Sequence, residues 1–308
     1  MTSESLANKK HIGVEASLKN LRIAVLDDEN VVSRLSIPLE SEGALLTQLA
    51  AVLNELKQTA GEIGGVGVAV PGLVNRQTNR VILSTQIPTL REMDFAADLQ
   101  QLTGLRTRLE NDANAAAYAE FRLGAGRGSS SMFFATIGEG IGGSFIINGQ
   151  IWRGAGGFAG EFGHIAIDED GVRLEDVASA AGVVRRVKER LYHDSTSSLS
   201  RRQLEQAASV HDVVDAAKNG DDFAQMMLIR TGRYIGTAIA TVINLLNPER
   251  IVVGGEVMEV ERVILESIVR QANERSFRPS LETTGIYAAE LSAEAAALGA
   301  ALLLTNDF

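Results

Sequence analysis

Two separate stretches of this 308-residue chain carry the same pattern, in which short runs of β-forming residues alternate with turn residues. The runs are residues 11–15, 21–26 and 31 onward in the first stretch, and 132–136, 144–147 and 151–152 in the second. In the second stretch, Asn148-Gly149 is the dipeptide most typical of a tight hairpin turn. Each stretch is therefore predicted to form an antiparallel meander, and the same unit is expected twice.

Patterns of both helix and strand follow each meander. Strand-like runs at 65–70 and 250–253 occur among segments of helical periodicity, which are residues 42–59, 95–102, 113–123, 178–191, 222–247, 259–274 and 293–304. This alternation predicts an α/β fold with two lobes, the smaller formed by residues 11–113 and 293–308 and the larger by 114–292. Because no low-complexity linker separates them, we expect the lobes to share a central cleft, where ligands tend to bind.

Composition and charge exclude several classes of protein. The 39 acidic and 29 basic side chains give a net charge of −10, which repels the phosphate backbone of nucleic acids. The complete lack of cysteine excludes disulfides, thiolate catalysis and cysteine zinc sites. The start of the chain is polar, unlike a signal peptide, and no apolar run reaches the ~20 residues that span a bilayer. We therefore expect a cytoplasmic protein without membrane contact.

A glycine-rich segment follows the first run of the second meander. Residues 138–143 fit the dinucleotide fingerprint G-x-G-x-x-G, but that motif must lead from a strand into a helix, and here a second strand follows. A Rossmann dehydrogenase is therefore excluded. Two interpretations stay open: a turn whose backbone faces a phosphate or a sugar, or a plain hairpin turn.

Two further motifs carry groups that can bind or activate a sugar hydroxyl. Glu110-Asn-Asp-Ala-Asn114 precedes an alanine-rich helix, so its side chains suit a helix N-cap, and a carboxylate there can also act as a general base. A glycine-rich segment ending in Glu161-Phe-Gly-His164 presents a carboxylate and an imidazole that can hydrogen-bond neighbouring hydroxyls. The alternatives for this second motif are a surface loop, or a carboxylate that only orients the histidine; a metal site is disfavoured because clustered ligands are lacking.

Together these segments resemble the ROK family of repressors, open reading frames and sugar kinases, from about residue 11 to residue 304. The resemblance rests on five segments: residues 70–72 (Val-Pro-Gly), 110–114, 138–143 with Asn148-Gly149, 153–164, and 247–255. It implies a two-lobe, actin-like and hexokinase-like fold built from a duplicated ribonuclease H-like unit around a central cleft.

The resemblance implies a nearly intact sugar site. Asn111, Asp112, Glu161 and His164 match residues that hold the sugar, and Asp112 matches the general base of the kinases. Glu175 matches a further sugar-binding glutamate, and Gln86 stands where relatives often place asparagine. In relatives a cysteine-rich zinc segment precedes that glutamate; because this chain has no cysteine, zinc is not expected and His164 should bind sugar alone.

On the nucleotide side the resemblance is degenerate. Family kinases carry an Asp-x-Gly-Gly-Thr phosphate loop where this chain has Glu15-Ala-Ser-Leu-Lys19, and bulky Leu18 should hinder a close approach of phosphate. Glu139 and Glu256 stand where kinases usually have threonine and glycine. The remaining positions that match the nucleotide loops are Gly138, Gly140, Gly142, Gly254 and Gly255.

This contrast leads us to expect a sugar-sensing protein close to the effector domain of ROK transcriptional repressors. Ligand control of that kind requires only a different sugar affinity in two conformations. Contact with DNA would need a helix-turn-helix segment, and we expect none within this sequence because too few residues precede the first strand. The alternative is an ATP-dependent sugar kinase, glucokinase-like, in which Asp112 deprotonates a sugar hydroxyl that attacks the γ-phosphate of Mg-ATP. A non-catalytic assembly protein is a third class, which the retained sugar residues argue against. A homodimer or higher homo-oligomer is expected only from the resemblance.

Overall fold

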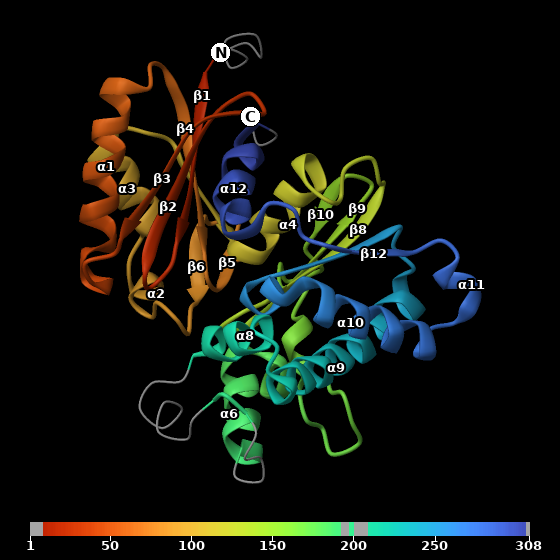
Figure 1. The fold of residues 1–308 in the computed structure, drawn as a ribbon. Helices are drawn as coiled ribbons and strands as arrows, with labels where there is room; N and C mark the ends of the chain where they lie inside the picture. The colour runs from red at the N-terminus through yellow and green to blue at the C-terminus, as the bar shows by residue number, and fades with distance from the viewer. Residues whose placement is uncertain (1–8, 192–196, 200–208, 306–308) are drawn as a thin grey trace. The chain divides into compact units, whose positions relative to one another are not determined.

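The computed structural model describes residues 9–191, 197–199 and 209–305. The polar first eight residues and the last three residues of the predicted smaller lobe lie outside this range. By their internal contacts the residues form two compact units (Figure 1). Unit 1 comprises Met1–Gly124, Arg153–Ala159 and Ala293–Phe308, and unit 2 comprises Ala125–Trp152 and Gly160–Ser292.

The sheet of unit 1 has five strands in the order β3-β2-β1-β4-β7. Their bounds are β1 Lys10–Ala16, β2 Asn20–Asp27, β3 Asn30–Pro38, β4 Ile63–Val70 and β7 Thr107–Asn111. The first three strands are antiparallel, as the meander predicted, and β4 and β7 continue the sheet in parallel with β1. A separate two-stranded sheet joins β5 (Leu73–Asn75) to β6 (Arg80–Leu83). Parallel β4 and β7 place their carboxyl ends at one edge, where ligand sites of α/β sheets commonly lie.

Helices cover both faces of this sheet. On one face lie α1 (Leu45–Thr59) and α3 (Phe95–Thr103), whose leucines and Phe95 form a core with the strands. On the other face lie α12 (Ala295–Thr305) and α4 (Asp112–Leu123), and Figure 1 shows α1 and α12 on opposite sides of the sheet. Because residues 295–304 of α12 are all buried, a helix that is apolar on every side is stable here.

Close contact between α12 and the sheet depends on small residues. A Cβ atom at Gly13 of β1 would lie 1.8 Å from the Ala297 carbonyl oxygen, so any side chain there would push the helix away. Alanines and Gly299 on the helix complete the fit. The packing therefore explains why this segment combines alanine, glycine and leucine.

The sheet of unit 2 repeats the topology of unit 1, with the order β10-β9-β8-β11-β12. The strands are β8 Ser131–Ile137, β9 Ile141–Ile147, β10 Gln150–Trp152, β11 Arg250–Gly254 and β12 Gly285–Ala288. Again three antiparallel strands are followed by two parallel ones. Asn148 and Gly149 both have positive φ, 52° and 74°, as the favoured tight hairpin turn requires. The duplicated unit predicted from the sequence is confirmed.

The helices that the structure describes in unit 2 pack into one core with β8 and β11. They are α5 Leu174–Ala178, α6 Ala180–Leu191, α8 Val210–Lys218, α9 Asp222–Leu246, α10 Glu261–Arg275 and α11 Arg278–Leu281. Phe133 of β8 stacks against Phe145 and Phe162 at centroid distances of 4.5 and 5.0 Å. Within the described part of the chain no helix is long and apolar enough to cross a membrane.

The seven helices predicted from periodicity are all present; the segment predicted at 178–191 corresponds to α6, with Ala178 at the end of the preceding α5. The strands β5, β6, β7 and β12 and the helices α2 (Thr89–Glu92), α8 and α11 were not predicted. The lobe boundaries at residues 113 and 292 stay a prediction about domains; by packing, α4 groups with unit 1.

Candidate functional site

Asn111 and Asp112 stand where strand β7 passes directly into helix α4. The Asn111 side chain is the N-cap, since its oxygen accepts a hydrogen bond from the Asn114 backbone N–H at 2.9 Å. The same side chain donates to the Gly72 carbonyl at 3.0 Å and to Asp112 Oδ1 at 3.1 Å. Asp112 is thereby held at the first turn of α4, at the carboxyl edge of the sheet.

The electrostatic surroundings of Asp112 favour its protonated form. Burial raises the pKa of Asp112 to about 7, and the negative charge of Glu15 adds to the rise. Hydrogen bonds from the Ala113 N–H, at 2.8 Å, and from Asn111 act in the opposite direction. A carboxylate with a pKa near neutrality is suited to take a proton from a hydroxyl group.

Gln86 is connected to the same edge of unit 1 through a short chain of contacts. The Ser84 hydroxyl donates to the Pro71 carbonyl at 2.5 Å and accepts the Ile87 N–H at 3.0 Å. Pro71 precedes Gly72, whose carbonyl accepts from Asn111. The Val-Pro-Gly turn therefore joins the half-buried Gln86 segment to Asn111 and Asp112.

Glu15 lies near the end of β1, and its charge is paired with an arginine that the sequence analysis did not single out. Arg22 on β2 is the register partner of Glu15 and donates to both its carboxylate oxygens, at 3.0 and 3.1 Å. Burial raises the pKa of Glu15, while Arg22 opposes that rise. Lys19, on the turn between these strands, is exposed.

A second unforeseen group is the buried Glu110, which binds two arginines. Arg76 and Arg153 donate to Glu110 Oε2 at 2.7 and 2.6 Å. Burial acts to raise the pKa of Glu110, but Arg153 and Arg76 together hold it below its ordinary value. Glu110 was visible in the motif; its partners, 34 and 43 residues away, were not.

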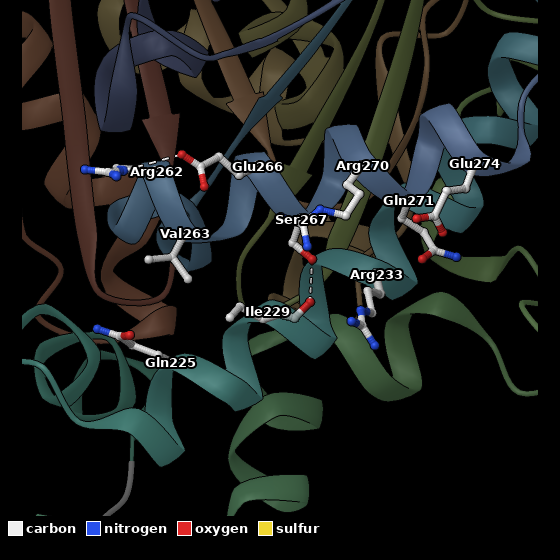
Figure 2. A pocket seen from close by; sticks show the side chains of 10 residues that line it. All are labelled: Gln225, Ile229, Arg233, Arg262, Val263, Glu266, Ser267, Arg270, Gln271 and Glu274. Carbon is white, nitrogen blue, oxygen red and sulfur yellow. Dashed lines mark hydrogen bonds and ion pairs between the residues drawn. The ribbon is translucent and has the colours of Figure 1, made fainter. Parts of the chain in front are cut away.

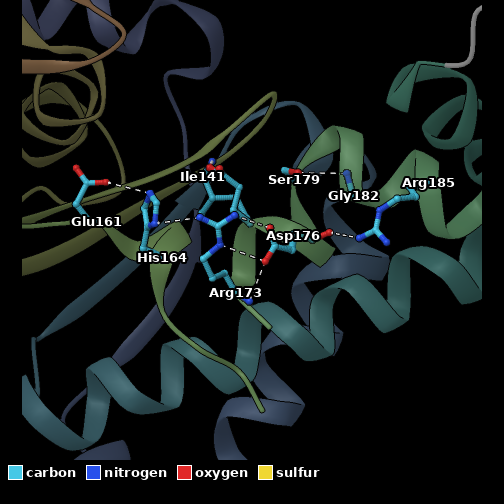
Figure 3. A network of polar contacts seen from close by, with 9 residues as sticks. Ile141, Glu161, His164, Arg173, Asp176, Ser179, Gly182 and Arg185 are labelled. Atoms are coloured by element: carbon cyan, nitrogen blue, oxygen red, sulfur yellow. Dashed lines mark hydrogen bonds and ion pairs between the residues drawn. The ribbon is translucent and has the colours of Figure 1, made fainter. Parts of the chain in front are cut away.

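In unit 2, a short 3-10 turn, Phe162–His164, directly follows Glu161 and ends at His164, and both side chains are exposed (Figure 3). His164 Nε2 lies 4.0 Å from Glu161 Oε2, and His164 Nδ1 lies 3.5 Å from Arg173 Nη1. Since arginine can only donate, a hydrogen bond between these two atoms requires the imidazole tautomer that carries its proton on Nε2. Arg173 is held in turn by Asp176 at 2.9 Å. The imidazole can therefore offer an N–H donor on the side of Glu161.

Glu175 is placed close to this turn by the backbone of unit 2. Its Oε2 accepts the Ile141 N–H at 3.0 Å. The same oxygen is 3.2 Å from the Cβ position of Gly163 and 3.3 Å from that of Gly140. Glu175 therefore joins the segment of Glu161 and His164 to the glycine turn between β8 and β9.

The glycines predicted to face a nucleotide gather at one end of the unit 2 sheet. Gly138 and Gly140 form the β8–β9 turn, closed by a hydrogen bond from the Gly138 N–H to the Gly140 carbonyl at 3.0 Å. Gly254 ends β11, and Gly255 has φ 100° with no room for a Cβ, which would lie 2.4 Å from the Ile137 carbonyl. Gly142 lies in β9 rather than in the turn.

The residues do not fit a zinc ion. The chain has no cysteine, and the described residues include no group of three or more histidines, aspartates or glutamates arranged to hold a metal. The loop from His164 to Glu175 is instead closed by backbone pairing, with Ile167 N–H donating to Val172 and Leu174 N–H to Ile165.

A groove of about 600 Å³ runs along α9 and α10, away from every residue that the sequence analysis selected (Figure 2). Its walls carry Arg233, Arg262 and Arg270 together with Glu266 and Glu274. Charges of both signs on an open helix surface are typical of a solvated face. We therefore place the candidate site at the sheet edges and not in this groove.

Comparison with known proteins identifies the family to which the chain belongs. The sequence pattern of the ROK family matches residues 11–307. A glucokinase of Halalkalibacterium halodurans is 31% identical over 281 residues, which cover 85% of each chain. A xylose repressor of Bacillus spizizenii is 26% identical, with 96% of this chain but 75% of the repressor covered.

A solved structure resembles the chain over nearly its full length. It is a ROK family glucokinase from Streptomyces griseus in complex with glucose and AMPPNP, which superposes with a TM-score of 0.79 at 27% identity. The match covers 96% of this chain and 98% of the glucokinase. The fold of the chain is thus that of the actin-like sugar kinases, as predicted.

Proposed function

Because the chain belongs to the ROK family, we propose that it is a sugar kinase, which transfers the γ-phosphate of Mg-ATP to a hydroxyl group of a hexose. In this proposal the sugar is bound by Asn111 and Asp112 of unit 1 and by Glu161, His164 and Glu175 of unit 2, with Gln86 as a further contact. Mg-ATP is the second substrate. The glucokinase relatives support this proposal over a sensor, which was our first expectation.

The observation that carries the proposal is the position and pKa of Asp112. Its carboxylate is fixed by the N-cap Asn111, and burial raises its pKa to about 7, so that it can gain or lose a proton near neutral pH. Deprotonation of a hydroxyl makes it a better nucleophile for phosphoryl transfer, and the enzyme's remaining task is to orient the substrates. Glu161 and the Nε2–H of His164 provide an acceptor and a donor for neighbouring sugar hydroxyls.

Formation of ADP that depends on sugar tests the proposal directly. The purified protein is mixed with Mg-ATP and, one at a time, with hexoses, amino sugars and pentoses, and ADP is measured. We expect turnover with at least one hexose and loss of turnover in Asp112→Asn. Asp98→Asn is the matched control, because Asp98 also lies in the first turn of a helix of unit 1. An absence of ADP formation with every sugar would refute the kinase.

A sugar-responsive regulator is the second candidate, and the first hairpin of unit 1 favours it. The β1–β2 turn has no glycine, and the Glu15 carboxylate at its start is already paired with Arg22. The similarity to the xylose repressor is consistent with such a role. A thermal-shift measurement separates the candidates: a regulator is stabilised by sugar without any effect of Mg-ATP, whereas a kinase is stabilised by both.

A further inference from the structure

The buried carboxylate of Glu110, next to Asn111 and Asp112 in the sequence, also binds residues from distant parts of the chain. The side chain is only 4% exposed. Its Oε2 accepts from Arg76 and Arg153, and its Oε1 accepts from the Asn111 N–H at 3.0 Å and from Asn114 Nδ2 at 3.1 Å. One buried charge therefore receives four hydrogen bonds from three separate segments of the chain.

The two oxygens of Glu110 act on different parts of the molecule. Oε1 holds the backbone at Asn111 and the side chain of Asn114, the residue that Asn111 caps. The start of α4, including Asp112, is therefore tied to this carboxylate. Oε2 holds the guanidinium of Arg153, from a segment more than 40 residues further along the chain.

Arg153 begins a closed glycine-rich segment. The Ala159 N–H donates to the Arg153 carbonyl at 3.0 Å, so the segment Arg153–Ala159 is a loop whose two ends meet at Arg153. This segment groups with unit 1, although the residues before and after it belong to unit 2. Anchoring Arg153 therefore anchors both ends of this loop. Glu161 lies only two residues after the end of the loop at Ala159.

We infer that Glu110 is a positioning residue that fixes the Arg153–Ala159 loop and the Asn111–Asp112 corner to each other, and thereby sets the affinity for sugar. Arg76, on the turn that joins β5 to β6, braces the same carboxylate at 2.7 Å. Glu110 itself does not need to touch the ligand, since its oxygens are occupied by protein donors. The inference rests on the proposed sugar site, but not on phosphoryl transfer.

The test uses three variants of the full chain: Glu110→Gln, Arg153→Gln and the double variant. Hydrogen exchange without ligand is measured at the amides of residues 111–114 and at the Ala159 amide, which closes the second segment. We expect the single variants to exchange at least ~10-fold faster in both segments, because a buried ion pair with one partner removed no longer holds its segment. Arg80→Gln is the matched control, since Arg80 pairs with Asp94 at 3.6 Å in an exposed setting.

The second measurement is the dissociation constant for the sugar that gives the largest thermal shift, with glucose as the starting probe. We expect Arg153→Gln and Glu110→Gln each to weaken binding at least ~10-fold, the double variant to resemble a single one, and Arg153→Lys to recover part of the loss. The KM for Mg-ATP should stay within about twofold of that of the unmodified protein. This measurement is the control for misfolding, because a variant that had lost the overall fold would also lose Mg-ATP binding.

Unchanged exchange in both segments, or additive effects of the two single variants, would overturn the inference. If the unmodified protein binds sugar without forming ADP, the kinase proposal fails while the affinity measurement still decides the role of Glu110. If Glu110→Gln does not fold, Arg153→Gln alone decides it by the exchange of residues 111–114.

Discussion

The two units join their first and second strands by turns that are equivalent in topology but opposite in chemistry. In the β1–β2 turn, Ser17 binds Asn20 through both backbone and side chain, at 2.9 to 3.1 Å, and Leu18 projects outward at 43% exposure. In the β8–β9 turn, Gly138 has no atom within 4 Å of its Cβ position. Of these two turns, only the second has open space at a glycine, so duplication of the fold has not duplicated the chemistry of the turn.

The first turn has a different neighbour, which is the proposed catalytic base. Glu15 raises the pKa of Asp112, and Arg22 keeps the Glu15 carboxylate paired. The end of β1 therefore adjusts the charge near Asp112, whereas the glycines of unit 2 suit a nucleotide. The following predictions test this division.

The largest effect is expected for Asp112→Asn. General-base catalysis contributes about 10²- to 10⁴-fold, so kcat should fall by that factor. Sugar affinity should change much less, because asparagine keeps a hydrogen-bonding oxygen. Steady-state kinetics together with calorimetry check this, and a kcat within tenfold of the unmodified protein would remove Asp112 as the base.

The same substitution should change stability in a direction set by pH. The pKa of Asp112 is raised to about 7 in the folded protein, so the stabilising protonated form is lost as pH rises through about 7. Asp112→Asn should therefore be more stable than the unmodified chain at pH 8, by roughly 2 to 4 kcal/mol, and about equal to it at pH 4. Urea unfolding at both pH values checks this; a variant that is less stable at pH 8 contradicts it.

Substitutions that exchange residues between the two turns should affect nucleotide affinity unequally. We expect Gly138→Leu to weaken Mg-ATP binding by about tenfold or more, because a leucine side chain would fill the open space beside this turn. Leu18→Gly should leave binding unchanged or improve it by less than about tenfold. Calorimetric titration with Mg-ATP decides, and equal losses in both variants would mean that the turns share the nucleotide.

The smallest effect is expected for Glu139→Gln, which removes an exposed negative charge from the β8–β9 turn. Exposed charges interact by roughly 0.2 to 1 kcal/mol, so Mg-ATP affinity should rise by about twofold. The gain should vanish at high salt because exposed charges are screened. A gain that persists at 1 M salt would point to a steric cause instead.

The fold could be predicted from the sequence where periodicity is strong. Both meanders and the long helices have clear alternation or helical spacing, and all were found. Strand β7 was missed because Thr107-Arg-Leu-Glu-Asn111 carries polar residues at an edge of the sheet, where tertiary pairing with β4 overrides weak local preference. That strand is the one that delivers Asp112 to its position.

The site could be predicted only in part, for a related reason. Asn111 as an N-cap follows from local sequence, and the structure confirms it. Glu15 and Arg22 are seven residues apart, and their pairing across the hairpin could be predicted only with the strand register in hand. The pairs of Glu110 with Arg76 and Arg153 needed the folded topology, since no local pattern links residues so far apart.

The central claim is that Asp112 acts as a base toward a bound sugar, and the pH dependence of sugar-dependent ADP formation tests it most directly. The account predicts that kcat/KM for the sugar rises with pH through a midpoint near 7, as Asp112 loses its proton, and that Asp112→Asn abolishes this rise. Binding of sugar without ADP formation at any pH between 5 and 9 would contradict the claim.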